Sequence, residues 1–207
     1  WNRHVMARSL ADSVLIEEAI ARLVGDATFG DTQLPFFAVA FDLIAGADVV
    51  IGEGDLARAL RASSAIPGIF EPVAAGDRLL VDGAVLQELP TAVARGLGAD
   101  FVVAVDVGSG LDPRPPASAA DVLQRVLALR GEHFVNESRQ LADVVIRPQV
   151  GGVHWSEFSR AEECIEKGTA AAREQLGFLL EQRRRRRRRS FLVRLAEPRR
   201  TVTVVGV

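Results

Sequence analysis

The chain has little of several features that would point directly to a function. Its 207 residues contain one cysteine, Cys164, which cannot form a disulfide within the chain and fits no metal-ligand spacing. We expect it to be half-buried on a helix. The three histidines, His4, His133 and His154, are scattered, and none has a cysteine, histidine or acidic partner at ligand spacing. The sequence therefore predicts neither a metal nor another cofactor.

Long hydrophobic runs are absent as well. No stretch approaches the ~18 uninterrupted apolar residues that a membrane-spanning helix needs. The first residues do not form a positively charged segment followed by an apolar one, as a signal peptide would. We expect the chain to begin inside a domain, so this observation leaves the compartment open.

The composition is that of a globular protein with a core, because 48% of the residues are hydrophobic and 25% are charged. The formal net charge of −2 conceals an asymmetry. Seven consecutive arginines, Arg183–Arg189, supply a basic segment near the end, so the rest of the chain is acidic. An acidic body argues against a nucleic-acid-binding domain.

Apolar periodicity and capping residues predict alternating helices and strands, which is typical of an α/β domain. The first helix, for example, carries an apolar face and is followed by Gly25, and Ser159 and Glu162 have capping-box spacing. The predicted helices are 13–24, 55–63, 90–97, 119–141 and 159–182, and the predicted strands are 36–43, 49–51, 78–81, 85–89, 101–107, 144–146 and 200–207.

Asp82 and Gly83 lie between two of the predicted strands. Asp-Gly in this position is a favoured hairpin turn, because glycine supplies the positive φ that such turns need. Alternatively, a carboxylate held at a strand end can accept a proton from a serine or hold its hydroxyl in place. No Gly-x-Ser-x-Gly motif occurs in the sequence, so this acid lacks an obvious nucleophile. The pattern leaves both interpretations open.

Other polar residues are weaker candidates for chemistry. Ser63 and Ser64 precede a bend, but no flanking glycines form a strand-to-helix elbow around them, and packing of small residues explains them better. Asp42 and Asp106 end apolar segments, where they are either second acids or caps for nearby backbone N–H groups. The segment 108–110 (GSG) follows a strand but completes no phosphate-binding pattern.

The arginine run has several interpretations. It is a linker, a solvated helix end, or a contact with anionic lipid headgroups, which contribute up to about 1 kcal/mol per residue near a charged membrane. No aromatic residues are interleaved with the arginines for base stacking, so we do not expect nucleic-acid binding.

An ordered series of segments closely resembles the second half of bacterial patatin-like phospholipase domains. The resemblance extends over about residues 1–180. The segments are 35–43 with Asp42, 56–72 (LARALRASSAIPGIFEP), 78–84 (RLLVDGA), 89–90 (LP), 97–100 (LGAD) and 158–162 (FSRAE).

This resemblance implies an α/β fold, the patatin-like three-layer α/β/α sandwich, truncated here at its N-terminus. It also implies a Ser–Asp dyad that hydrolyses phospholipids or other acyl-ester lipids without a cofactor. The family's acid corresponds to Asp82, and Gly83 and Ala84 complete its motif. The serine elbow and the oxyanion loop belong before residue 1, so we expect the nucleophile to be absent and the chain alone to be inactive.

The end of the chain shows a second resemblance, between 198–207 and the first strand of a polypeptide-transport-associated (POTRA) domain. Some bacterial patatin-like proteins continue into such a domain and an outer-membrane barrel, which would place the hydrolase outside the cytoplasm. A plain terminal strand fits equally well. The expected organisation is a hydrolase domain over 1–182, an arginine-rich linker over 183–197 and the POTRA-like strand over 198–207.

The sequence thus supports a lipid acyl hydrolase with Asp82 as the dyad acid. Two alternatives stay open. One is a non-catalytic remnant of such a domain that binds a membrane or a partner. The other is an incomplete gene product of marginal stability.

Overall fold

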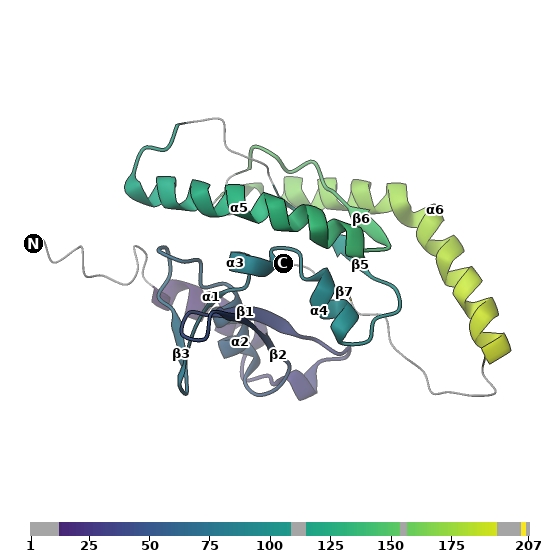
Figure 1. The fold of residues 1–207 in the computed structure, drawn as a ribbon, viewed down its shortest axis with the longest axis horizontal. Coiled ribbons are helices and arrows are strands. Elements are labelled where there is room, and N and C mark those ends of the chain that lie inside the picture. The colour runs from purple at the N-terminus through teal and green to yellow at the C-terminus, as the bar shows by residue number, and fades with distance from the viewer. Residues whose placement is uncertain (1–12, 109–114, 154–156, 194–203, 206–207) are drawn as a thin grey trace, which may run out of the picture. The chain divides into compact units, whose positions relative to one another are not determined.

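The computed structural model describes residues 13–108, 115–153, 157–193 and 204–205. The chain forms two compact units: the first unit combines residues 1–88 with 118–134, and the second unit combines residues 89–117 with 135–207. Each unit contains strands and helices (Figure 1), which confirms the α/β class expected from the sequence.

The first unit is built on a four-stranded sheet with the order β2-β1-β4-β3. Every neighbouring pair in this sheet is antiparallel. A hairpin joins the first two of these strands, since Asp42 pairs with Ala47 and Gly46 takes a positive φ in the turn. The strands are β1 (Ala38–Asp42), β2 (Ala47–Ile51), β3 (Val73–Ala75) and β4 (Arg78–Asp82).

Helix α2 (Leu56–Ser63) packs against this sheet and forms much of the first unit's core. Asp55 starts the helix by accepting the Arg58 N–H at 2.6 Å, as predicted. Alanines in β1 leave room for the helix to approach closely. The buried cluster members are Phe29, Ala38, Leu56 and Ala59, and a second cluster contains Ala40, Ala62 and Leu80. Helix α1 (Ser13–Val24) has the predicted bounds. The other helical elements of this unit are η2 (Phe29–Asp31), α3 (Ala84–Gln87) and the first part of α5 (Ala119–Leu141).

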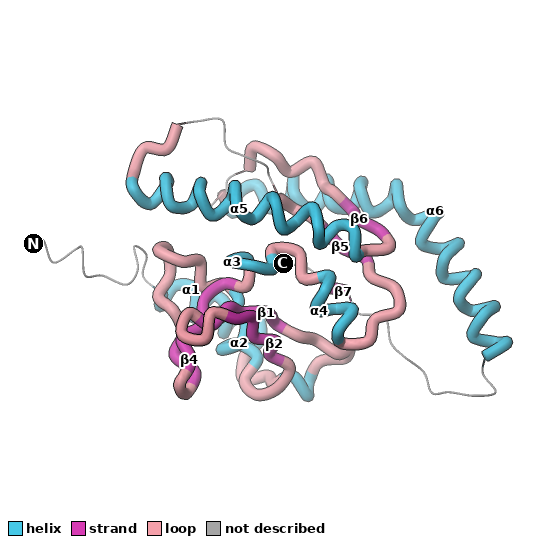
Figure 2. Tube along the Cα trace, in the orientation of Figure 1, coloured by secondary structure: helices cyan, strands magenta, loops and turns pink. Residues whose placement is uncertain are grey.

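The second unit contains a parallel sheet with the order β6-β5-β7. Its strands are β5 (Val103–Val105), β6 (Val144–Ile146) and β7 (Val204–Val205), and its helical elements are α4 (Thr91–Gly96), the last part of α5 (Ala119–Leu141), η3 (Phe158–Arg160) and α6 (Ala161–Val193). The tube in Figure 2 shows β5 and β6 side by side. Phe101, Val144 and Ile146 form a buried cluster against Ala171 and Leu179 of α6.

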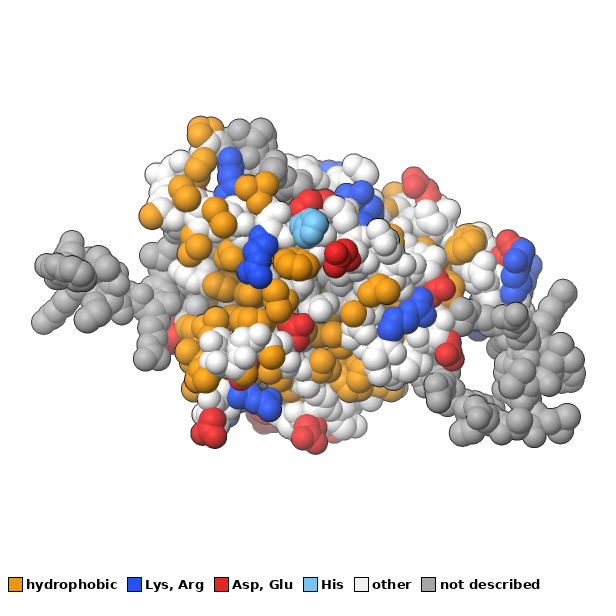
Figure 3. Space-filling model, in the orientation of Figure 1, with side chains coloured by type: hydrophobic (Ala, Val, Ile, Leu, Met, Phe, Trp, Pro, Cys, Tyr) orange, Lys and Arg blue, Asp and Glu red, His pale blue; other side chains and the backbone are white. Residues whose placement is uncertain are grey.

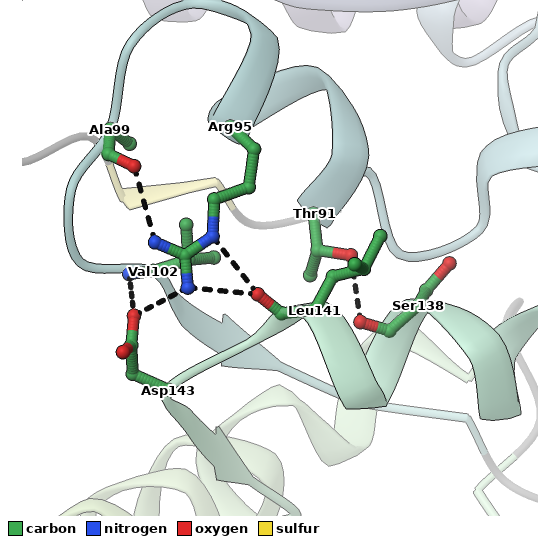
Figure 4. A network of polar contacts seen from close by, with 7 residues as sticks. All are labelled: Thr91, Arg95, Ala99, Val102, Ser138, Leu141 and Asp143. Atoms are coloured by element: carbon green, nitrogen blue, oxygen red, sulfur yellow. Dashed lines mark hydrogen bonds and ion pairs between the residues drawn. The ribbon is translucent and has the colours of Figure 1, made fainter.

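A polar network joins α4 to the end of α5 within the second unit (Figure 4). The Arg95 guanidinium donates to the carbonyls of Leu141 and Ala99 and pairs with Asp143 at 2.7 Å. The same Asp143 carboxylate accepts the Val102 N–H at 2.8 Å. These contacts fix the start of β6 beside the segment that leads into β5.

Three predicted elements differ most from the structure. The expected strand 85–89 is wrong, because residues 84–87 form α3, and the expected strand 101–107 is shorter, since β5 spans only residues 103–105. Helix α6 does not stop near residue 182 but continues to Val193, so the arginine run is helical backbone. This agrees with the helix-end interpretation of the run.

Of the β-rich tail, only β7 lies within the described residues, where it pairs with β5; residues 198–203 and 206–207 lie outside them. The POTRA-like assignment stays a prediction. In the part of the chain that the structure describes, no helix combines the length and apolar character needed to cross a bilayer.

Candidate active site

Asp82 is the last residue of β4, so the sheet holds its backbone on the strand side. It pairs with Ala40 of β1 in the antiparallel register. Its N–H donates to the Ala65 carbonyl, with an N···O distance of 3.0 Å, which ties the strand end to the segment after α2. The backbone of this acid is therefore fixed by two separate elements of the first unit.

The Asp82 carboxylate is half-buried and has one backbone donor. Its Oδ1 accepts the Ala84 N–H at 2.8 Å, and no hydrogen bond to Oδ2 occurs among the described residues. Burial raises the pKa of the Asp82 carboxyl above its ordinary value, and the Ala84 N–H offsets part of this shift by stabilising the ionised form. A carboxylate whose pKa moves towards neutrality is a better base.

Gly83 turns the chain from β4 into α3. Its φ of −63° and ψ of −21° are right-handed helical, so the hairpin turn with positive φ is wrong. Glycine is needed for a different reason, because a Cβ at this position would lie 2.6 Å from the Val39 carbonyl oxygen. The backbone of the turn therefore lies directly against β1.

Asp42 ends β1 and acts as a backbone cap, as one of the two sequence interpretations expected. Its Oδ1 accepts the N–H of Ile44 at 2.9 Å and that of Leu79 at 3.3 Å. The bond from Ile44 is the main reason that the pKa of Asp42 is lowered, against the opposing effect of burial. A carboxylate held in its ionised form by backbone donors is a poor proton acceptor.

Asp106 follows β5 in the second unit and is also a cap, since its Oδ1 accepts the Gly108 N–H at 3.1 Å. Its Oδ2 pairs with Arg139 at 2.7 Å and with Arg147 at 3.1 Å. Sequence reasoning missed these arginines, because both lie more than thirty residues away along the chain. The two ion pairs occupy this carboxylate and argue against a catalytic role.

The serines before the bend have structural surroundings. The Ser63 hydroxyl donates to the Val39 carbonyl at 2.7 Å, which links α2 to β1. Ser64 is the C-cap residue that follows α2. The Ser63 hydroxyl thus makes a structural contact. That neither serine is a nucleophile stays a prediction.

Arg61 was not recognised from the sequence, although it is almost fully buried, with 4% of its surface exposed. Its Nη2 donates to the Glu71 carbonyl at 2.8 Å, and its Nε lies 3.4 Å from a Glu17 carboxylate oxygen. The guanidinium also lies over the Phe70 ring, 5.8 Å from its centroid. Arg61 therefore fixes the segment after α2 that also contacts the Asp82 backbone. An arginine inside a run of small residues was the available signal.

Residues considered for metal or nucleotide binding do not gather in the described part of the structure. There, no group of three or more His, Cys, Asp or Glu side chains could hold a metal ion. His133 is exposed and contacts the Phe134 ring, and Cys164 is half-buried on α6, as predicted. His4, His154 and residues 109–110 of the GSG segment lie outside the described residues.

The arginine run lies on the C-terminal turns of α6. Arg183, Arg184 and Arg185 are exposed, and Arg185 pairs with Glu181 at 2.5 Å. The side chains of 186–189 lie outside the described set, although their backbone is helical.

Comparison with known proteins identifies the first half of the chain. Residues 1–95, which include Asp82, Gly83 and Ala84, match the family described as patatin-like phospholipase. An uncharacterised NTE family protein of Mycobacterium tuberculosis is 33% identical over 144 residues, which cover 67% of this chain and 40% of that protein. A second protein so described in the same organism is 31% identical over 179 residues, covering 72% of this chain and 30% of that protein.

A mammalian relative matches a shorter part. The patatin-like phospholipase domain-containing protein 7 of Mus musculus is 39% identical over 93 residues, covering 44% of this chain and 7% of that protein. The chain thus spans 40% or less of the length of these relatives. The mixed α/β architecture is consistent with a patatin-like α/β/α fold.

Proposed function

Residues 1–95 belong to the patatin-like phospholipase family, and from this premise we propose that the chain supplies the acid of a serine lipid acyl hydrolase. The acid is Asp82, with Gly83 and Ala84 as the residues that position it. The observation that carries the proposal is the half-buried carboxylate at the end of β4, with one oxygen anchored and the pKa raised.

The environment of Asp82 suits a base in acyl transfer. The Ala84 N–H orients Oδ1, which leaves Oδ2 to accept a serine hydroxyl. As the serine oxygen bonds to the ester carbonyl carbon, its proton passes to the carboxylate and then to the leaving alcohol. Water would release the acyl group by the same route in reverse. No histidine is required in such a dyad.

The nucleophile of the proposed dyad comes from outside these 207 residues, because the sequence contains no Gly-x-Ser-x-Gly motif. The isolated chain should therefore hydrolyse no ester, and the substrate is proposed to be a phospholipid or another acyl-ester lipid. The exposed arginines at the end of α6 support a proposed contact with anionic headgroups, which would weaken as salt increases.

Hydrolysis by the full-length product of the gene tests the proposal. We expect Asp82→Asn to lower kcat on p-nitrophenyl butyrate and on phosphatidylcholine vesicles by about 10³-fold, because a general base contributes 10²–10⁴-fold. Asp77→Asn is the matched control, since Asp77 is exposed in the turn before β4. Circular dichroism confirms that each variant is folded. Undiminished hydrolysis by folded Asp82→Asn would rule out the assignment.

A further inference from the structure

Helix α5 exposes an apolar surface in the first unit, which we name the α5 stripe. It consists of Val122, Leu123, Val126 and Leu129, whose exposed fractions lie between 49% and 55%. Figure 3 shows hydrophobic side chains gathered over the first half of α5, with basic side chains among them. Four half-exposed aliphatic side chains within two helical turns form a continuous patch.

The local structure turns the α5 stripe away from the core. The helix begins at a capping box, in which the Ser118 N–H donates to Asp121 at 2.9 Å and the Asp121 N–H to the Ser118 hydroxyl at 3.1 Å. Gly131, about half a helical turn from the stripe, is buried, and a Cβ there would lie 2.8 Å from a Glu88 carboxylate oxygen. One side of α5 therefore faces protein while the stripe faces outward.

Charged residues around the stripe are arranged asymmetrically. Arg125 and Arg130 lie about 70° to either side of the line through Val122, Val126 and Leu129, at about 100° per residue. Asp121 and Glu132 lie farther round the helix, about 90° or more from that line. The Arg130 guanidinium lies over the Phe134 ring at 5.6 Å. Arg125 therefore lies along one edge of the stripe and Arg130 lies between the line and Leu123, whereas the acidic groups lie farther from the line.

We propose that the α5 stripe docks the protein on an anionic lipid surface. An apolar helix face with arginines beside it matches the acyl boundary and the anionic headgroups of a membrane at the same time. The stripe contains only valine and leucine, which are under-represented among the residues that dominate protein–protein binding. The proposal deepens the proposed function, because a lipid hydrolase must reach a substrate that lies in a membrane.

Vesicle co-sedimentation of the full-length product tests the docking. The probe is vesicles of equal parts phosphatidylcholine and phosphatidylglycerol, at about 0.15 M and about 1 M NaCl, because high salt screens the arginine run but not apolar insertion. We expect binding to persist in part at high salt. Val126→Glu/Leu129→Glu should weaken that residual binding about tenfold or more. The uncharged pair Val126→Gln/Leu129→Gln should weaken it in the same direction.

The control is Leu176→Glu, which places a charge at an apolar position of similar exposure on α6. It should leave the residual binding unchanged. No binding at high salt, or equal binding by the α5 variants and the wild type, would overturn the docking proposal. A dimer that forms without vesicles and dissociates in the α5 variants would also overturn the proposal, because a second copy of the chain would then cover the stripe. Since this assay measures no hydrolysis, its failure leaves the assignment of Asp82 untouched.

Discussion

Asp42 and Asp82 end neighbouring strands of one antiparallel sheet, yet their surroundings move their pKa values in opposite directions. Asp42 is the more buried of the two, with 3% of its surface exposed, but its pKa is lowered. Asp82 is half-buried, and its pKa is raised. The difference follows from the backbone donors: Ile44, Leu79 and Ala45 stabilise the Asp42 carboxylate, whereas Ala84 alone does so at Asp82.

Burial therefore does not decide the role of a strand-end carboxylate in this fold. A carboxylate surrounded by N–H groups becomes a fixed part of a turn. One that is desolvated with a single donor keeps an oxygen for another partner. This contrast separates a structural acid from a candidate base on two strands that hydrogen-bond to each other.

Asp106, the third acid at a strand end, pairs with two arginines instead of accepting mainly backbone N–H groups. Asp106→Asn should destabilise the chain by about 3 kcal/mol, because it removes the carboxylate that pairs with the largely buried Arg139 guanidinium. Arg147→Gln is the matched control, since Arg147 is 57% exposed and its loss should cost less than about 1 kcal/mol. Urea unfolding measures both. Equal effects would show that burial of the partner does not matter here.

Gly83→Ala tests the close packing that places Asp82 against β1. The new Cβ would contact the Val39 carbonyl, so we expect a loss of about 2 kcal/mol from overpacking. Gly96→Ala is the control, because nothing lies within 4 Å of its Cβ position and alanine favours the helix there. We expect the urea midpoint of Gly83→Ala to fall and that of Gly96→Ala to stay unchanged or rise. A stable Gly83→Ala variant would mean that the turn can move.

Ser63→Ala tests whether the hydroxyl on α2 is structural. Removing its bond to Val39 should cost about 1 kcal/mol in stability. Hydrolysis by the full-length product should stay unchanged, because the nucleophile lies elsewhere. A complete loss of hydrolysis by a folded Ser63→Ala variant would instead make Ser63 a candidate nucleophile.

The smallest effects are expected from Asp42→Asn and Asp82→Asn on the stability of the isolated chain, and they should differ in sign. The pKa of Asp82 is higher in the folded than in the unfolded state. Between these two pKa values the native state binds more protons than the unfolded state, so stability falls as pH rises through this range. Asp82→Asn should therefore raise the urea midpoint at pH 7. Asp42 has a lowered pKa, so its contribution is present at neutral pH and is lost as pH falls through the folded pKa.

Asp42→Asn should accordingly lower the urea midpoint at pH 7. The effect of Asp82→Asn should shrink below the ordinary aspartate pKa, where Asp82 is protonated in both states. The effect of Asp42→Asn should shrink at lower pH, as pH falls from the ordinary aspartate pKa towards the lowered folded pKa of Asp42. Midpoints that shift in the same direction at pH 7 would remove the contrast between the two acids.

Local signals in the sequence predicted much of the first unit. Apolar periodicity gave the bounds of α1, and Asp55 marked the start of α2. The signal failed after Asp82, where an apolar segment resembled a strand. There the Asp82 side chain accepts the Ala84 N–H, and Gly83 packs on Val39 of the neighbouring strand. Apolar periodicity along one segment cannot reveal the contact between Gly83 and Val39.

Long-range partners and helix length were the other misses. The arginines that pair with Asp106 come from α5 and from the segment after β6, which no local pattern connects. Helix α6 was expected to end before the arginine run, but arginine is a good helix former, and the helix continues to Val193. The role of Asp82 came from the family resemblance, because the Asp-Gly pattern alone also fits a simple turn.

The most direct test of Asp82 as the base is the rate at which a fluorophosphonate probe labels a serine in the full-length product. Such probes react with serines that a neighbouring base activates. We expect Asp82→Asn to slow labelling by about 10²-fold or more, and Asp42→Asn to label at nearly the wild-type rate. Labelling of folded Asp82→Asn at the wild-type rate would contradict the account.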